Sequence, residues 1–344
     1  MIGRHVFAYS AALCVVLLLH AVVVGQDPAE VSRLTAELRG SSDQQTYTQA
    51  REVGRSLISA GRYKEAAGLF DLLVEKQSNE FAVVYLAALA SFNAGRPERA
   101  ELLVRRAVDI AFAAGDPPPP SHAANAADAL VLMAVVLAVR NNDSEALNAA
   151  ERAVRLAPNS FDAQFVHGRA LFGSSDYAGA ARAFRRAVNL KPSEAEAQFF
   201  LATALERSGD DAASLIVYRR LAKEFPQRVE GHLGIGVLLV KKGGASLNEG
   251  MDELQAALRI NSRIYEARIT LGRALVMSGR PAEALDHLKI AAELAPNNPE
   301  PHYQLSIAYR RLGRKQEAAA ESAIVKRIHE SRRTPTKSKP RAVP

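Results

Sequence analysis

A pattern of small and large residues recurs every 34 residues, and this period constrains the fold more than any other feature of the sequence. The clearest copy spans residues 161–194. Gly168 and Ala180 are small at points where one helix must approach another closely. Phe184 is predicted to fill the space between the two helices, and Pro192 to end the second one. A period of this length indicates stacked helix pairs, each of which contacts only its neighbours.

The sequence contains eight copies of the unit, including the one at 161–194, and together they predict an all-α fold. The copies begin at residues 47, 81, 127, 161, 195, 229, 265 and 299. The sixth copy holds two extra residues around Gly243-Gly244. Five glycines are expected to end the first helix of their pairs in a left-handed conformation: Gly61, Gly95, Gly209, Gly279 and Gly313.

The spacing resembles the tetratricopeptide repeat, whose pattern is W-x2-L-G-x2-Y, then A-x3-F, then A-x4-P. The best match consists of Leu271, Gly272, Leu275, Ala284, Leu288, Ala291 and Pro296. The tryptophan position is never tryptophan, and holds Gln164, Gln198, His232 or His302 instead. The resemblance covers nearly all of the chain after its leader. It implies a right-handed superhelical solenoid of about eight antiparallel helix pairs with a concave groove.

The first 25 residues have the character of a secretory signal peptide. Arg4 and His5 precede a long apolar stretch, and small or modest residues from Val23 to Gly25 offer a cleavage site. The alternative is an uncleaved anchor formed by residues 6–25, with the repeats still outside the cytoplasm. Either interpretation predicts an exported protein, periplasmic or secreted.

The rest of the chain divides into five predicted segments. These are an N-terminal capping segment at 26–46 with a helix over 28–39, repeats 1–2 at 47–114, a proline-rich linker at 115–126, repeats 3–8 at 127–330 and a basic tail at 331–344. The four prolines of the linker predict an extended, non-helical segment, either a surface loop or a hinge. The tail contains too few apolar residues to fold and is predicted to be disordered.

The formal charge of +7 does not belong to the repeats. Residues 1–25 carry one net positive charge and residues 326–344 carry six, so the repeat body is neutral. A basic surface running along the repeats is therefore not supported, and nucleic acid is an unfavoured partner.

The sequence contains no recognisable catalytic or metal-binding motif. It holds neither HExxH nor GxxxxGK, and its one cysteine, Cys14, lies in the leader. No cofactor and no metal are expected. His232 and His302 occupy a packing position, which favours a structural role over metal ligation. The chain is predicted not to be an enzyme.

The resemblance implies that positions 2, 5, 9 and 12 of each unit line the groove. The residues predicted there to bind a protein or peptide partner are Tyr85, Phe92, Phe165, Arg169, Phe172, Phe199, Arg273 and Tyr303. Phe165, Arg169, Phe172 and Phe199 form a central group that mixes aromatic residues with arginine, as binding hot spots do. The alternative is that several of these side chains pack against a neighbouring helix.

Position 2 is acidic in the last six units: Asp128, Asp162, Glu196, Glu230, Glu266 and Glu300. An acid at a helix N-terminus is favourable by itself, so a structural role is the first interpretation and a rim that selects basic partners the second. The leading functional hypothesis is a non-catalytic exported scaffold or peptide-binding solenoid. The alternative is an electrostatic adaptor whose basic tail binds an anionic polymer or a membrane surface.

Overall fold

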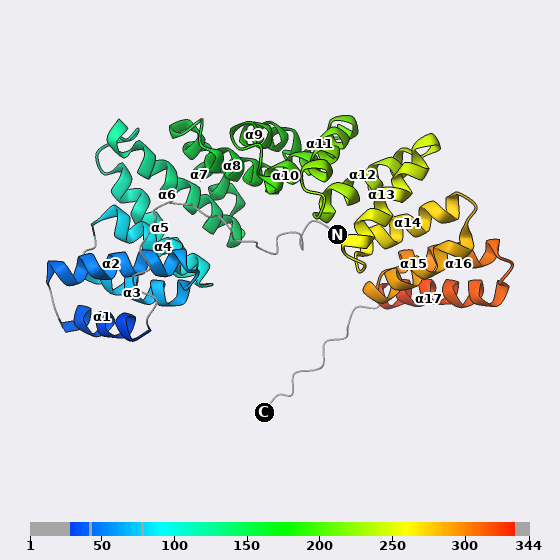
Figure 1. Cartoon of the computed structure of the whole chain (residues 1–344), viewed down its shortest axis with the longest axis horizontal. Coiled ribbons are helices and arrows are strands. Elements are labelled where there is room, and N and C mark those ends of the chain that lie inside the picture. Colours follow the sequence, from blue (N-terminus) through cyan, green and yellow to red (C-terminus); the bar gives the residue numbers. More distant parts are fainter. Residues whose placement is uncertain (1–27, 41–42, 77–78, 334–344) are drawn as a thin grey trace, which may run out of the picture. The chain divides into compact units, whose positions relative to one another are not determined.

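The computed structural model describes residues 28–40, 43–76 and 79–333, and these residues form seventeen α-helices (Figure 1). The first nine are α1 (Pro28–Gly40), α2 (Gln44–Ser59), α3 (Tyr63–Lys76), α4 (Phe81–Asn93), α5 (Pro97–Phe112), α6 (Pro120–Val139), α7 (Asp143–Leu156), α8 (Phe161–Gly173) and α9 (Tyr177–Leu190). The others are α10 (Ala195–Arg207), α11 (Asp211–Glu224), α12 (Val229–Lys242), α13 (Leu247–Ile260), α14 (Tyr265–Met277), α15 (Pro281–Leu294), α16 (Pro299–Arg311) and α17 (Lys315–Arg333). A short 3₁₀ turn, Gly244–Ser246, holds part of the insertion before α13.

From α2 onward the helices pack in eight consecutive pairs, which confirms the predicted all-α repeat fold. We call the even-numbered helices from α2 to α16 the first helices, and the odd-numbered ones from α3 to α17 the second helices. The chain divides after Lys191 into two compact units. The first unit contains α1–α9, and one continuous hydrophobic core runs from Val31 to Val166. The second unit contains α10–α17 and has separate clusters over α10–α12 and α12–α17.

A small residue on a first helix faces a large residue on its partner helix, as the sequence predicts. A Cβ atom added to Gly168 of α8 would lie 2.7 Å from the ring of Phe184 on α9. A Cβ atom added to Gly272 of α14 would lie 2.5 Å from Leu288 Cδ2 on α15. Phe184 and Leu288 are both fully buried, so these contacts fix how closely each pair of helices packs.

The turns between paired helices also follow the prediction. The five glycines named above have φ between +73° and +89°. In each turn the residue after the glycine donates its backbone N–H back into the first helix, as Arg280 does to the carbonyl of Leu275 over 2.9 Å. Asn141 and Ser175 hold the same left-handed position in the α6–α7 and α8–α9 turns, with φ of 60° and 67°. Neither residue was expected there.

The linker after α5 is shorter than predicted, because α6 begins at Pro120 and residues 120–126 are helical. Proline suits the first position of a helix, and the alanine-rich residues that follow have high helix propensity. The non-helical part packs on its neighbours. Asp116 pairs with Arg152 of α7 at 3.3 Å, and the Arg152 guanidinium lies 4.5 Å from the centre of the Phe112 ring. Since the hydrophobic core continues from α5 into α6, the two sides of the linker belong to one unit.

The 20-residue helix α6 is long and apolar enough, by length and composition, to cross a membrane. Half of its most apolar stretch is buried inside the protein, where α6 packs against α5, α7 and α8. A core helix with neighbours on several sides is apolar all round for this reason.

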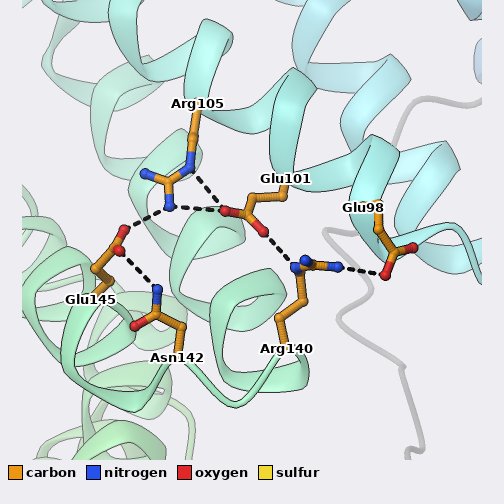
Figure 2. Close-up of polar contacts among 6 residues, drawn as sticks. All are labelled: Glu98, Glu101, Arg105, Arg140, Asn142 and Glu145. Carbon is orange, nitrogen blue, oxygen red and sulfur yellow. Dashed lines mark hydrogen bonds and ion pairs between the residues drawn. The ribbon is translucent and has the colours of Figure 1, made fainter.

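A network of ion pairs and hydrogen bonds ties α5 to the turn between α6 and α7 (Figure 2). Its centre is Glu101 on α5, which accepts from both Arg105 and Arg140. Arg105 also donates to Glu145 over 2.6 Å, and Asn142 donates to the same carboxylate over 2.8 Å. Six residues contribute: Glu98, Glu101, Arg105, Arg140, Asn142 and Glu145. Isolated surface pairs stabilise little, whereas shared partners fix the geometry of several groups at once.

At the N-terminal end of the described chain, α1 buries Val31, Leu34 and Leu38 against α2 and α3. At the other end α17 continues to Arg333, so the first three residues of the predicted tail are helical. The predicted signal peptide and the rest of the tail lie outside the described residues.

Candidate binding surface

All eight residues predicted to line the groove lie on first helices. Tyr85 and Phe92 are on α4 and Phe165, Arg169 and Phe172 on α8, all in the first unit, while Phe199 on α10, Arg273 on α14 and Tyr303 on α16 belong to the second. The predicted central group is therefore divided between the units, since Phe199 belongs to a different unit from the three residues of α8.

Within α8, Phe165 belongs to the core of its helix pair. Its side chain is 5% exposed. Its ring stacks on Phe161 with centroids 5.6 Å apart and meets Phe184 of α9 at 5.7 Å. Truncating this side chain would open a cavity, so a binding test on Phe165 would measure packing as well as recognition.

The other two α8 residues are more accessible. Arg169 and Phe172 are both half-buried. The Phe172 ring makes an edge contact with Tyr177, the first residue of α9, at 5.1 Å. This contact holds one side of the ring and leaves part of the side chain in solvent.

On α4, the Tyr85 ring stacks on Phe81 at 5.6 Å, and Phe92 packs against the core from one side. Burial raises the pKa of the Tyr85 hydroxyl, and the negative charges of Asp128 and Asp162 raise it further. Partial burial and the charge of Asp162 likewise raise the pKa of Asp128. Tyr85, Asp128 and Asp162 therefore lie within electrostatic range of one another, each on a different first helix of the first unit.

In the second unit the predicted residues range from half-buried to exposed. Phe199 is half-buried, with its ring 5.6 Å from that of Phe200. Arg273 is exposed, and Tyr303 has 50% of its surface exposed. Met277, one turn beyond Arg273 on α14, is 57% exposed and was not predicted. Met277 directly follows position 12 of its unit, the last position predicted to line the groove. This place in the sequence is the signal that could have identified it.

The six acidic residues at position 2 of the units have two different structural settings. Asp162, Glu196, Glu230, Glu266 and Glu300 lie in the first turns of their helices, where the helix dipole favours an acid. Burial acts to raise the pKa of Glu230, but hydrogen bonds, chiefly from Arg228 at 2.7 Å, lower it overall. Asp128 is the exception, because α6 begins eight residues earlier and places it in mid-helix. The dipole argument for Asp128 is therefore wrong.

The residues that replace tryptophan make specific polar contacts. Gln164 and Gln198 each donate through Nε2 to a proline carbonyl before their helix, Pro158 and Pro192, over 2.8 Å. His232 and His302 each place Nδ1 2.6 Å from a glutamate of the partner helix, Glu253 and Glu321. Gln198 also donates to Glu224 of α11 over 2.6 Å, so it and the two histidines join the helices of their pairs, whereas Gln164 ties α8 to the segment before it. Among residues 28–40, 43–76 and 79–333, no group of three or more His, Cys, Asp or Glu side chains could hold a metal ion.

The fold and its repeated contacts define a protein built from successive helix pairs, and comparison with known proteins identifies the family. A family model described as tetratricopeptide repeat matches residues 52–117, 165–229, 252–299 and 269–328, more than half of the chain. The chain belongs to the tetratricopeptide repeat family.

Among solved structures, the MamA protein is 17% identical, with a TM-score of 0.46, over 54% of this chain and 98% of its own. YrrB, described as a TPR protein with an unusual peptide-binding site, is 18% identical, with a TM-score of 0.44, over 50% of this chain and 88% of its own. A thermophilic TPR protein from Thermus thermophilus is 23% identical, with a TM-score of 0.40, over 50% of this chain and 92% of its own. A comparison with curated proteins finds no match.

Proposed function

We propose that this chain is a non-catalytic scaffold that binds a protein or peptide along its first helices. The observation that carries the proposal is the exposure of Arg273, Met277 and Tyr303 on α14 and α16. Arginine and tyrosine are enriched at binding hot spots, and an exposed methionine adapts its shape to an apolar partner. Large side chains left in solvent contribute little to the fold and are available to a partner.

The half-buried residues of α4 and α8 supply the corresponding surface in the first unit. Tyr85, Phe92 and Phe172 each have one side of the ring held by a neighbour. A ring held in this way loses little conformational entropy on binding, which favours recognition. Membership of the repeat family supports a protein partner over a small molecule.

The test compares exposed and buried positions. Tyr303→Ala and Arg273→Ala, singly and together, should weaken capture of the native partner while helicity and the urea midpoint stay unchanged. Ile216→Ala on the second helix α11 is the matched control, since Ile216 is 70% exposed and outside the predicted surface. Equal partner capture by the double variant and by Ile216→Ala would refute the assignment of this surface.

Export is part of the proposal and rests on the leader sequence. Residues 1–25 combine a short basic start with a long apolar stretch. N-terminal sequencing of the protein recovered from its native cells should show a mature chain that starts near Gln26. A chain that retains residues 1–25 and fractionates with membranes would favour the anchor, and a full-length cytoplasmic chain would refute export.

The alternative function is an electrostatic adaptor, favoured by the concentration of positive charge after residue 325. Contacts of this kind weaken steeply with salt. Deleting residues 331–344 should then release the protein from anionic polymer or vesicles at low salt. Unchanged binding after the deletion would eliminate this role for the tail.

A further inference from the structure

The second helix α9 differs from every other second helix in the charge of its outer face. Each of the other seven carries at least two acidic residues, whereas α9 has none. Its charged residues are three exposed arginines: Arg182, Arg185 and Arg186. The uncharged residues exposed beside them include the small or short side chains of Ala178 and Asn189, which leave the guanidinium groups accessible.

Among the residues that the structure describes, none forms an ion pair or hydrogen bond with these three guanidinium groups. On the neighbouring second helix α11, by contrast, both arginines have acidic partners. Arg219 pairs with Glu249 at 2.6 Å and Arg220 with Glu224 at 2.8 Å. Asp176, just before α9, accepts from the backbone N–H of Gly179 as the N-cap. The charge of Glu151 on α7 raises the pKa of His167, whereas that of Arg186 lowers it.

Helix stability does not account for the arrangement. Arg182 stands three and four residues before Arg185 and Arg186, and like charges at these spacings destabilise a helix. The helix dipole favours cations in the last turn, and the last turn of α9 contains none. The arginine cluster therefore costs stability in the free protein.

We propose that Arg182, Arg185 and Arg186 form a second binding surface, outside the first-helix surface, that takes an acidic segment of a partner protein. Each guanidinium can bind a carboxylate with two parallel hydrogen bonds, which lysine cannot do. Three arginines on two turns match a short segment rich in Glu and Asp. The partner's charge would also relieve the repulsion within the cluster.

Other anionic partners fit less well. The three arginines of α9 could meet fewer phosphates than the roughly six to ten contacts of a typical nucleic-acid-binding protein, and the repeat body around them has no net positive charge. The aromatic residue of α9 at its start, Tyr177, is half-buried against Phe172 and offers no exposed stacking platform. Leu190, 39% exposed, is the one large apolar residue on the outer face of α9, which is too little for membrane insertion.

The experiment measures binding of a fluorescent Glu/Asp-rich peptide to the full chain at low and moderate salt. The variant Arg182→Gln, Arg185→Gln, Arg186→Gln should lose about tenfold in affinity, as expected when three exposed charge pairs of about 0.5 kcal/mol each are removed. The control is Arg219→Gln, Arg220→Gln, Lys223→Gln on α11. It removes the same charge and keeps the same tail, and it should bind like the parent. Replacing the three α9 arginines with lysine should give an intermediate affinity.

Equal affinity of the α9 and α11 variants for the peptide would show that the three α9 arginines do not form its binding surface. Tighter binding of an oligonucleotide or of anionic phospholipid vesicles through the same three arginines would overturn the choice of partner. Urea unfolding separates both results from misfolding, because the α9 variant should be at least as stable as the parent.

Discussion

The helix pair α8–α9 of the first unit and the pair α14–α15 of the second are alike inside and different outside. Inside each pair, a glycine on the first helix meets a large buried side chain on the second: Gly168 with Phe184, and Gly272 with Leu288. Outside, α9 carries three arginines that have no ion-pair partner among residues 28–40, 43–76 and 79–333, whereas α15 carries charges of both signs. The repeat fixes the interior of a pair and leaves its surfaces free to differ, so function is to be sought on the surfaces.

The largest loss of stability should come from truncating the large buried side chain of this glycine contact. Phe184→Ala should lower the free energy of unfolding by about 3–5 kcal/mol and Leu288→Ala by about 2–5 kcal/mol, because each leaves a cavity at a fully buried site. Urea denaturation measures each loss. Hydrogen exchange should then place the loss within the unit that carries the substitution, since each repeat contacts only its neighbours. Losses below about 1 kcal/mol would contradict the interlocking account.

Replacing the glycine of the same contact with a larger residue should destabilise the protein less. Gly168→Leu and Gly272→Leu should each cost about 1–3 kcal/mol through overpacking. Gly173, at the end of α8, has no heavy atom within 4 Å of an added Cβ and provides the control. Gly173→Ala should be neutral or slightly stabilising in thermal unfolding, and a loss as large as that of Gly168→Leu would show that space is not the cause.

The turns of the two pairs should respond in opposite directions. The α14–α15 turn has Gly279 at φ +75°, and the α8–α9 turn has Ser175 at φ +67°. Gly279→Ala should cost about 1–2 kcal/mol, because a side chain is strained in the left-handed region. Ser175→Gly should gain about 0.5–1 kcal/mol by relieving that strain. Calorimetric melting of both variants checks the signs, and a destabilised Ser175→Gly would refute the account of this turn.

The smallest effect concerns one histidine in each pair. Burial lowers the pKa of His167 on α8, and the charge of Arg186 adds to this; burial and Arg268 do the same for His287 on α15. The folded state disfavours the charged form, so each histidine stabilises fully above its unfolded pKa of about 6.5 and loses this contribution as the pH falls.

Replacing either histidine with glutamine should therefore reduce the loss of stability between neutral and mildly acidic pH. NMR titration provides the sharper measurement. Arg186→Gln should raise the pKa of His167 and leave that of His287 unchanged. An unchanged pKa of His167 would show that the charge of Arg186 does not act on it.

The sequence predicted the repeated interior well, because the small residues, the turn glycines and the terminating prolines recur at a fixed spacing. It placed the eight candidate residues on first helices, but their exposure could not be inferred from position alone. Phe165 is buried because Phe161 and Phe184 enclose it, which depends on the side chains of two helices. The early start of α6 was missed because the prolines before it suggested a longer linker than the structure has.

The central claim, that the first helices bind a partner, is tested most directly by site-specific photo-crosslinking. A crosslinking amino acid placed at Tyr303 on α16 should join the chain to a discrete protein partner in its native compartment. The same group at the more exposed Ile216 on the second helix α11 should not. Crosslinking at Ile216 equal to that at Tyr303, or none at Tyr303, would contradict the claim.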